Sequence, residues 1–291
     1  MSILTVKMRT ITPVWTGGLD RTSDFAKTSG LVGSIRWWYE SLVRGLGGYA
    51  CDPTSPDSCI FDSAEYERTH RIEDGLQDVC FACRLFGCTG WSGKFMLLVA
   101  DSAGNVGDVN VNKSGVDFTL KLVELKPIID VERWLLSAAF WIIDEYGSIG
   151  GKTTAKPPKR PDYGIVEVVE NIDFQLTRDD VVQWIEEQMN ASEVMQSKLS
   201  MLPREYPNLR YFFFHPDDWL DTNEMNRLLR SDRTKFLAGQ RGVSKKVFSF
   251  KDGSRFWGYT TGDEMLQQVM NTLASMEVEE TMTGGDVLDE L

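Results

Sequence analysis

Four of the five cysteines fall in two pairs that could bind a metal ion. Seven residues separate Cys51 from Cys59, and two residues separate Cys80 from Cys83. A Cys-x-x-Cys turn lets two thiolates reach one tetrahedral zinc ion. We therefore predict a structural zinc site that staples an irregular loop through Cys51, Cys59, Cys80 and Cys83.

Two other interpretations of these cysteines stay open. They could be separate buried thiols, because free cysteine often packs as a small apolar residue, and the first pair is spaced more widely than usual zinc ligands. If a zinc site forms with a different ligand set, Cys88 and His70 are the reserve ligands. A redox role is less favoured, because no thioredoxin-like strand precedes the Cys-x-x-Cys turn.

A first glycine-rich segment, Gly30–Arg36, opens a predicted helix. Small residues at a helix N-terminus expose backbone N–H groups to an anion, and Arg36 adds a positive charge one turn further on. The segment therefore predicts an anion-binding helix start.

A second glycine-rich segment, Gly147–Thr154, resembles a phosphate-binding loop. Only three residues separate Gly147 from the Gly-Lys-Thr triplet, where a nucleotide-binding P-loop has four. The segment also follows a predicted helix instead of a strand, and Pro157 and Pro158 argue against a helix after it. These features argue against a nucleotide hydrolase. A loop whose backbone holds RNA phosphates stays open as an alternative.

Acid–base catalysis has little support in the sequence. The only histidines, His70 and His215, lie far apart, and His215 follows a buried-looking strand. The sequence lacks the Gly-x-Ser-x-Gly, His-Glu-x-x-His and protein-kinase motifs.

Among the aromatic residues, Trp38 belongs to an apolar helix stripe and is assigned to the core, whereas Trp15, in a glycine-rich turn, could stack on a base.

The net charge of −12 argues against nucleic acid as a partner, because phosphate contacts need Lys and Arg. The basic residues are nevertheless grouped: residues 1–50 carry +3, residues 152–160 carry +4 and residues 233–255 carry +6. This distribution fits an acidic body with basic surfaces that contact RNA selectively. Ordinary scatter of surface charge is the alternative, and charge alone favours it.

Hydrophobic periodicity in the first half predicts alternating strands and helices. Strands are expected at 2–12, 94–100, 116–125 and 165–174, and helices at 30–46 and 130–146, the first capped by Thr28 or Ser29. Residues 48–80 look irregular. This element order is that of a ferredoxin-like α+β unit over residues 1–170, with an insertion at 48–80.

The second half repeats the alternation more loosely. It has a helix at 177–190 capped by Thr177 with Asp180, strands at 211–214 and 246–251, and helices at 221–230 and 262–275. We predict a second ferredoxin-like unit at 171–276 and a frayed acidic tail at 277–291.

No apolar run is long enough to span a membrane, and the first residues lack the apolar core of a signal peptide. A cytoplasmic protein without a membrane partner is therefore expected.

Four segments together resemble one protein family. They are Thr12–Gly18, Ser29–Glu40, Cys80–Trp91 and Tyr146–Thr153. In this order they resemble the RAMP superfamily of CRISPR-associated proteins, and most of all the first-numbered subunit of the Cmr (type III-B) effector complex. The resemblance covers roughly residues 1–165.

The resemblance implies two ferredoxin-like, RRM-related units with a glycine-rich loop after the last helix of the first. It implies a non-catalytic subunit at the end of a helical ribonucleoprotein filament, with other RAMP or Cmr subunits as partners. There it would contact the 3′ side of the guide RNA and the paired target RNA. In that family, the aspartate that cuts the target belongs to the backbone subunit.

The residues and the resemblance together indicate one RNA-facing edge. Contacts to phosphate would ignore base sequence, and pairing with the guide would carry specificity. The candidate RNA-binding residues are Trp15, Thr16, Gly17, Gly18, Gly30, Gly33, Ser34, Arg36, Arg44, Gly150, Gly151, Lys152, Thr153, Thr154, Lys156, Lys159, Arg160 and, on charge alone, Lys235, Arg241, Lys245 and Lys246.

Two alternative functions remain at this point. The first is a RAMP-type endoribonuclease that processes guide RNA, since some relatives use His and Tyr near the glycine-rich loop. Here Tyr146 and Tyr163 flank the loop, but no histidine is close in sequence. The second is a protein-only scaffold in which the glycines serve tight packing.

Overall fold

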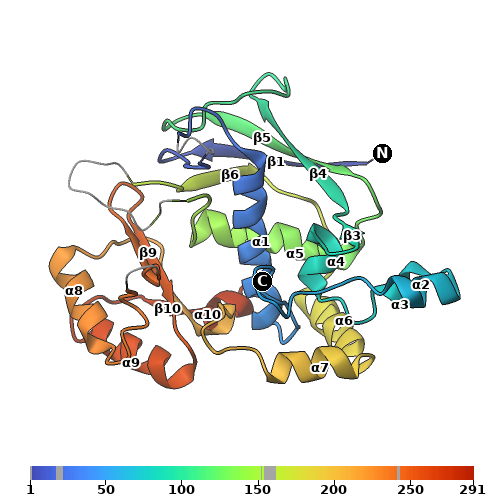
Figure 1. Cartoon of the computed structure of the whole chain (residues 1–291). Helices are drawn as coiled ribbons and strands as arrows, with labels where there is room; N and C mark the ends of the chain where they lie inside the picture. Colours follow the sequence, from blue (N-terminus) through green and yellow to red (C-terminus); the bar gives the residue numbers. More distant parts are fainter. Residues whose placement is uncertain (1, 18–21, 152, 154–161, 241–242) are drawn as a thin grey trace.

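The first of two four-stranded sheets has the ferredoxin-like strand order. A computed structural model describes residues 2–17, 22–151, 153, 162–240 and 243–291. Its first sheet holds the strands in the order β4-β5-β1-β6, all antiparallel. The strands are β1 (Ile3–Thr10), β4 (Phe95–Asp101), β5 (Asp117–Glu124) and β6 (Val166–Glu170). Helices α1 (Thr28–Gly45) and α5 (Asp130–Glu145) cover one face of this sheet (Figure 1).

The alternation within β1 explains which face α1 and α5 cover. Val6 and Met8 are buried under the helices, whereas Lys7 and Arg9 point to the open face. Lys7 pairs with Glu170 at 2.5 Å, and Arg9 pairs with Asp117 at 2.7 Å. The period of two residues therefore separates a core face from a charged face.

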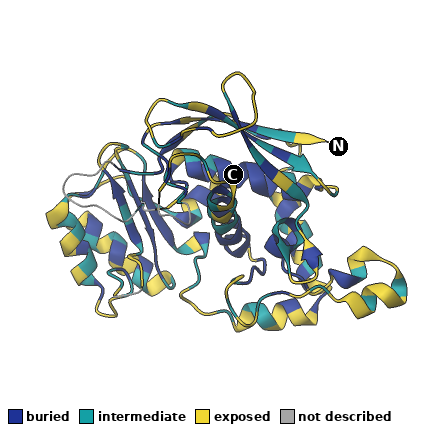
Figure 2. Ribbon diagram, turned by 45° about the horizontal axis from the view of Figure 1, so that its top comes forward, coloured by how far each residue is buried: buried dark blue, intermediate teal, exposed yellow. Residues whose placement is uncertain are grey.

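The second sheet repeats the same topology without a recognisable sequence repeat. Its strands lie in the order β10-β7-β9-β8. In both sheets the fourth strand of the unit lies beside the first, followed by the third and the second. Its elements are β7 (Phe212–His215), α8 (Thr222–Ser231), β8 (Val247–Phe250), β9 (Arg255–Tyr259), α9 (Asp263–Ala274) and β10 (Met282–Thr283). The expectation of two ferredoxin-like units is confirmed. In Figure 2 the strands of this sheet are buried almost throughout, whereas the outward faces of its helices are exposed.

The acidic tail is folded, so the prediction of a frayed end was wrong. β10 pairs with β7, and α10 (Gly284–Asp289) buries Val287 and Leu288. The Thr283 hydroxyl accepts from the backbone N–H of Asp286, and the Asp286 carboxylate accepts from the backbone N–H of Thr283. This capping box starts a short helix within a stretch whose composition suggested only solvated charge.

Gly284 lets the tail approach the rest of the chain closely. A Cβ atom there would lie 1.6 Å from the carbonyl oxygen of Leu209. We expect Gly284→Ala to lower the free energy of unfolding by about 3 kcal/mol, the upper range for overpacking. Gly285→Ala is the matched control, because its Cβ would meet only the Thr283 hydroxyl at 3.4 Å. Urea unfolding of the two variants checks this, and equal stabilities would contradict it.

Several short elements lie outside the two sheets. The predicted irregular insertion contains α2 (Ser63–Thr69) and α3 (Ile72–Gly75) and leads into α4 (Phe81–Phe86), with a small hairpin of β2 (Gly87–Cys88) and β3 (Trp91–Ser92). The units are linked by α6 (Arg178–Asn190), α7 (Glu193–Ser200) and the 3-10 helix η1 (Leu209–Tyr211). Thr177 and Asp180 cap α6 as expected. The second sheet therefore begins at residue 212, well after the expected boundary at 171.

Helix α1 joins the two units through aromatic side chains. Trp38 is 1% exposed, which confirms its assignment to the core. Its ring centroid lies 5.0 Å from that of Trp257 and 5.8 Å from that of Phe212. One hydrophobic core consequently runs from the first sheet through α1 into the second. Within the part of the chain that is described, no helix is long and apolar enough to cross a membrane.

Candidate functional site

The second glycine-rich loop contacts both other segments of the expected RNA-facing edge. The backbone N–H of Gly151 donates to the carbonyl of Trp15 at 2.7 Å. The backbone N–H of Gly150 donates to the hydroxyl of Ser34, in the first turns of α1, at 3.0 Å. The turn, the helix start and the loop, which are distant in sequence, therefore meet at one place.

These contacts change the expected role of the glycine amides. The N–H groups of Gly150 and Gly151 already donate within the protein, so they do not form a free cradle for phosphate. Gly150 has φ +86°, and a Cβ there would lie 2.6 Å from the Trp15 carbonyl oxygen. Glycine is needed here for a left-handed backbone and for close packing.

Gly30 plays the corresponding role at the start of α1. A Cβ on Gly30 would lie 2.5 Å from the carbonyl oxygen of Thr16, whereas a Cβ on Gly33 would have no described atom within 4 Å. We expect Gly30→Ala to lower the free energy of unfolding by about 1–3 kcal/mol. Gly33→Ala should be neutral or stabilising by up to about 1 kcal/mol, because alanine favours the helix. Thermal unfolding distinguishes them, and a stable Gly30→Ala variant would show that the turn is free to move.

A cleft between the two units opens beside these glycines. It has a volume of about 320 Å³. The first unit contributes Ser34, Trp37, Trp38, Ser148, Gly150 and Thr153, and the second contributes Ser244, Lys245, Lys246, Phe248, Trp257 and Tyr259. The described lining has two cationic side chains and no acidic one. An aromatic and basic cleft is suited to nucleic acid, because rings can stack on bases while lysines contact phosphates.

The basic side of the cleft lies at the start of β8. Lys245 is exposed, and Lys246 is half-buried with its Nζ 5.8 Å from the ring centroids of Phe236 and Tyr259. Burial lowers the pKa of Lys246, against the charge of Glu205, which raises it. Phe248 stacks on Trp257 with centroids 3.8 Å apart. Sequence analysis found the lysines by charge but missed these aromatic neighbours, although β8 and β9 beside the basic run are rich in aromatic residues.

Other candidate residues of the edge have structural contacts of their own. Thr16 is buried, and its hydroxyl donates to the carbonyl of Phe25 and accepts from the N–H of Lys27. Lys27, not Thr28 or Ser29, is the N-cap of α1, and it has no side-chain cap bond. Trp15 is half-buried and meets Tyr163 edge-on at 5.9 Å.

The remaining candidates divide by exposure. Gly33, Gly151 and Lys235 are exposed, and Gly17 is half-buried with φ +55°. Seven candidates lie outside the described residues: Gly18, Lys152, Thr154, Lys156, Lys159, Arg160 and Arg241.

Arg44 does not belong to the RNA-facing edge. Its side chain is buried, and its guanidinium donates to the carbonyls of Ala50, Pro207 and Cys51 at 2.9, 2.9 and 3.1 Å. Burial lowers its pKa, against the charge of Glu40, which raises it. Arg44 therefore holds the insertion and the inter-unit linker against α1. Its guanidinium is too deeply buried to contact RNA.

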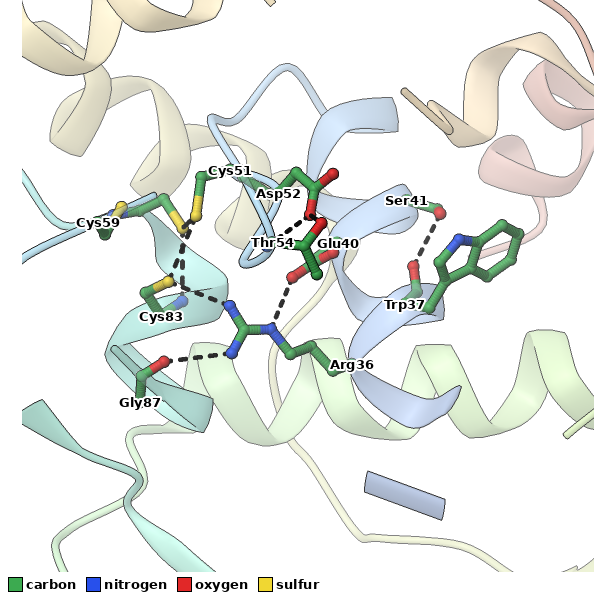
Figure 3. A network of polar contacts seen from close by, with 12 residues as sticks. Arg36, Trp37, Glu40, Ser41, Cys51, Asp52, Thr54, Cys59, Cys83 and Gly87 are labelled. Atoms are coloured by element: carbon green, nitrogen blue, oxygen red, sulfur yellow. Dashed lines mark hydrogen bonds and ion pairs between the residues drawn. The ribbon is translucent and has the colours of Figure 1, made fainter. Parts of the chain in front are cut away.

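The four predicted metal ligands come together at the N-terminal end of α4. Figure 3 shows three of them, Cys51, Cys59 and Cys83. Their sulfur atoms all lie within 4.8 Å of one another, and all four residues are buried. Cys51 Sγ lies 3.5 Å from Cys83 Sγ and 3.7 Å from Cys80 Sγ. Neither Cys88, which is half-buried, nor His70, which is exposed, belongs to this set among the described residues.

This geometry fits a tetrahedral metal centre. Zn–S bonds of about 2.3 Å place the sulfurs of a tetrahedron about 3.8 Å apart. The separations are much longer than a disulfide, whose sulfurs lie about 2.0 Å apart. Backbone N–H groups of Cys80 and Cys83 donate to the sulfurs of Cys59 and Cys80 at 3.3 and 3.4 Å, as expected where sulfur carries negative charge. The four buried cysteines can therefore bind a metal ion.

Arg36 faces this cluster and not the start of α1. It donates from Nη2 to Cys83 Sγ at 3.1 Å, from Nη1 to the Gly87 carbonyl at 3.2 Å and from Nε to Glu40 at 2.7 Å. Burial acts to lower the pKa of Arg36, but the Glu40 carboxylate and the Cys83 sulfur together outweigh it, and the pKa is raised. Burial raises the pKa of Glu40, against its bond from Arg36. The expectation that Arg36 binds a phosphate is therefore replaced by a role beside the cysteines.

A sequence family accounts for the first unit. The family model of the RAMP superfamily matches residues 7–155, which is just over half of the chain. The chain belongs to the RAMP superfamily. The match includes the Trp15 turn, α1, the cysteine cluster and the first part of the glycine-rich loop.

Comparison with solved structures finds similar chains among Cmr proteins. Cmr1 from Pyrococcus furiosus in its apo form is 13% identical with a TM-score of 0.47, covering 98% of this chain and 99% of that one. A chain of the type III-B Cmr-beta complex bound to cognate target RNA and AMPPnP, in the presence of ssDNA, is 10% identical with a TM-score of 0.48, covering 94% and 99%. A chain of Cmr-beta bound to cognate target RNA is 10% identical with a TM-score of 0.39, covering 79% and 72%. No curated protein matches the chain.

Proposed function

We propose that this RAMP protein is a non-catalytic, RNA-binding subunit of a type III-B CRISPR (Cmr) ribonucleoprotein complex. It would cap the filament near the 3′ side of the guide RNA and contact the backbones of guide and target RNA in antiviral defence. The observation that carries the proposal is the cleft between the units, where Lys245 and Lys246 lie beside aromatic rings and the glycine-rich loop. Membership of the superfamily and the four sequence segments support the same assignment.

The cleft would bind RNA without reading its sequence. Lys245 and Lys246 would contact phosphates, and the half-buried rings of Trp37 and Phe248 would offer an apolar surface to ribose or base. Such contacts fix the path of a strand and leave base edges free. Sequence specificity would come from pairing between guide and target.

A non-catalytic role agrees with the composition of the cleft. RNA cleavage by acid–base chemistry needs a titratable acid and base within reach of the reacting groups. The described lining holds no histidine, aspartate or glutamate. His215 is buried in β7, where its Nδ1 accepts from the backbone N–H of Asp217. These placements support a binding subunit over an endoribonuclease.

Ultraviolet crosslinking of the assembled complex tests this function. The full chain would be expressed with Cmr partner subunits, purified with bound RNA, irradiated and digested, and the crosslinked peptides identified. We expect crosslinks in residues 13–37, 147–164 and 243–259. An intact complex whose partners crosslink while this chain does not would favour the protein-only scaffold. Trimming of added guide precursor by the isolated chain would favour the endoribonuclease.

For the cysteine cluster, we propose that the metal is zinc and that its role is structural. The four-sulfur donor set, its burial and its lack of an open coordination position are typical of structural zinc sites. The metal would fasten the insertion to α4 and to the adjoining side of α1.

A further inference from the structure

The guanidinium of Arg36 links α1 to α4 beside the cysteine cluster. Its three nitrogen atoms each have a different acceptor: Glu40 on the same helix, the carbonyl of Gly87 at the end of α4, and Cys83 Sγ within α4 (Figure 3). The side chain is largely buried, as is that of Glu40. Glu40 pairs with Arg36 and also with Arg44, so two largely buried cations share one carboxylate. The second positive charge needs an explanation, because burying charge is costly unless it is paired.

The charge of a metal-loaded cluster supplies that explanation. Four thiolates around one divalent ion leave two excess negative charges in a buried place. Arg36 bonds directly to one sulfur, and Arg44 donates to the backbone carbonyl of Cys51. Glu40 lies between the two arginines, 2.7 Å from Arg36 and 3.7 Å from Arg44. The row Arg36, Glu40 and Arg44, spaced four residues apart on α1, therefore presents net positive charge to the cluster.

We propose that Arg36 is a positioning residue of the metal centre, which holds the Cys83 thiolate in place and offsets its charge. The inference rests on the proposed zinc site and goes beyond it, because it assigns a function to a side chain that is not a ligand. Partners of this kind orient metal ligands and tune their donor strength.

Lysine cannot reproduce the Arg36 contacts. The planar guanidinium directs N–H groups from three separate nitrogen atoms, whereas an ammonium has one nitrogen on a flexible stem. Arg36→Lys keeps the charge but cannot reach Glu40, Gly87 and Cys83 in the same geometry. Arg36→Met removes the charge while keeping much of the side-chain volume. Comparing the two variants therefore distinguishes the effect of the positive charge from the effect of the hydrogen-bond geometry.

Zinc release to a chromogenic chelator measures the effect in the full-length protein. We expect release to be about tenfold faster or more in Arg36→Met, the range seen when partners of metal ligands are lost, and intermediate in Arg36→Lys. Arg84→Met is the matched control. Arg84 follows Cys83 on α4, but it donates to Val79, Gln77 and Gln188 and not to a sulfur. Its release rate should stay near that of the wild type.

Cobalt substitution adds a spectroscopic measurement, the position of the charge-transfer band, which general destabilisation of the fold would not change. Loss of the hydrogen bond to Cys83 should shift the thiolate-to-cobalt charge-transfer band in Arg36→Met and not in Arg84→Met. Wild-type release and an unshifted band in Arg36→Met would overturn the role of Arg36 while leaving the zinc site intact. Equal acceleration by Arg84→Met without a band shift would also overturn it. A wild-type protein that binds no zinc would overturn both proposals.

Discussion

Replacing Cys80 or Cys83 with serine is expected to abolish zinc binding and to cause the largest loss of stability of any single substitution in the first unit. Structural zinc contributes about 10 kcal/mol or more of apparent binding free energy. Most substitutions change stability by about 1–3 kcal/mol. A domain of ordinary stability, about 5–15 kcal/mol, has little reserve against such a loss. Zinc content should fall from one ion per chain to nearly none.

The burial pattern of the insertion explains why the effect should be so large. Between Cys51 and Cys59 every residue is exposed or half-buried. The two cysteines are therefore the only deeply buried side chains that fix this loop. Cys83 has a further contact through Arg36, so Cys83→Ser should release both the loop and the end of α4.

Zinc analysis and thermal unfolding of purified full-length variants check this expectation. Cys88→Ser is the comparison variant. Cys88 is half-buried and contacts Cys83, but it lies outside the four-sulfur cluster, so this variant should keep one zinc per chain. Incubating the wild type with a strong chelator should reproduce the lower unfolding temperature of Cys80→Ser. A Cys80→Ser protein with full zinc content and wild-type stability would contradict the assignment.

Local patterns in the sequence were sufficient to place most elements. Hydrophobic periodicity found α1, α5 and α9 to within two residues, and the capping box at Thr177 marked the start of α6. The Cys-x-x-Cys spacing led to all four members of the cluster. Each of these signals is carried by neighbouring residues, so it does not depend on how distant segments pack.

The failures share a dependence on distant segments. Arg36 and Arg44 lie off the apolar stripe of α1, which suggested a solvent-facing side. Helix α4 packs on that side against Arg36, and the insertion packs there against Arg44, so both guanidinium groups are largely buried. Their spacing with Glu40 was a readable sign of a paired charged row. The folded tail was not predicted because β10 has only two residues and is a strand only through its pairing with β7.

The cleft was predicted only in pieces. Charge indicated Lys245 and Lys246, and the two glycine-rich segments indicated Ser34 and Gly150, but nothing in the sequence joined them. They meet because the start of β8 in the second unit faces α1 of the first across the aromatic junction. Contacts between two units with no shared sequence repeat cannot be read from periodicity within either one.

Lys245→Ala combined with Lys246→Ala is expected to weaken RNA binding by the assembled complex about tenfold or more at physiological salt. Each lysine that contacts a phosphate displaces counterions, and the slope of log affinity against log salt is about −0.7 per contact for single-stranded nucleic acid. Loss of two contacts should therefore make the slope shallower by about 1.4. A packing defect would lower affinity without changing the slope in this way.

Arg68→Ala combined with Arg71→Ala is the matched control, because it removes the same number of cations from a different surface. Arg68 on α2 and Arg71 beside α3 are exposed, and Figure 1 places these helices on the opposite side of the molecule from the second sheet. Their loss should leave both affinity and salt slope unchanged, although it makes the chain more acidic by the same amount. If both double variants weaken binding equally, net charge and not the cleft governs association with RNA. If neither does, the cleft lies off the path of the RNA, and the lysines stand beside the aromatic rings only as part of the junction between the units.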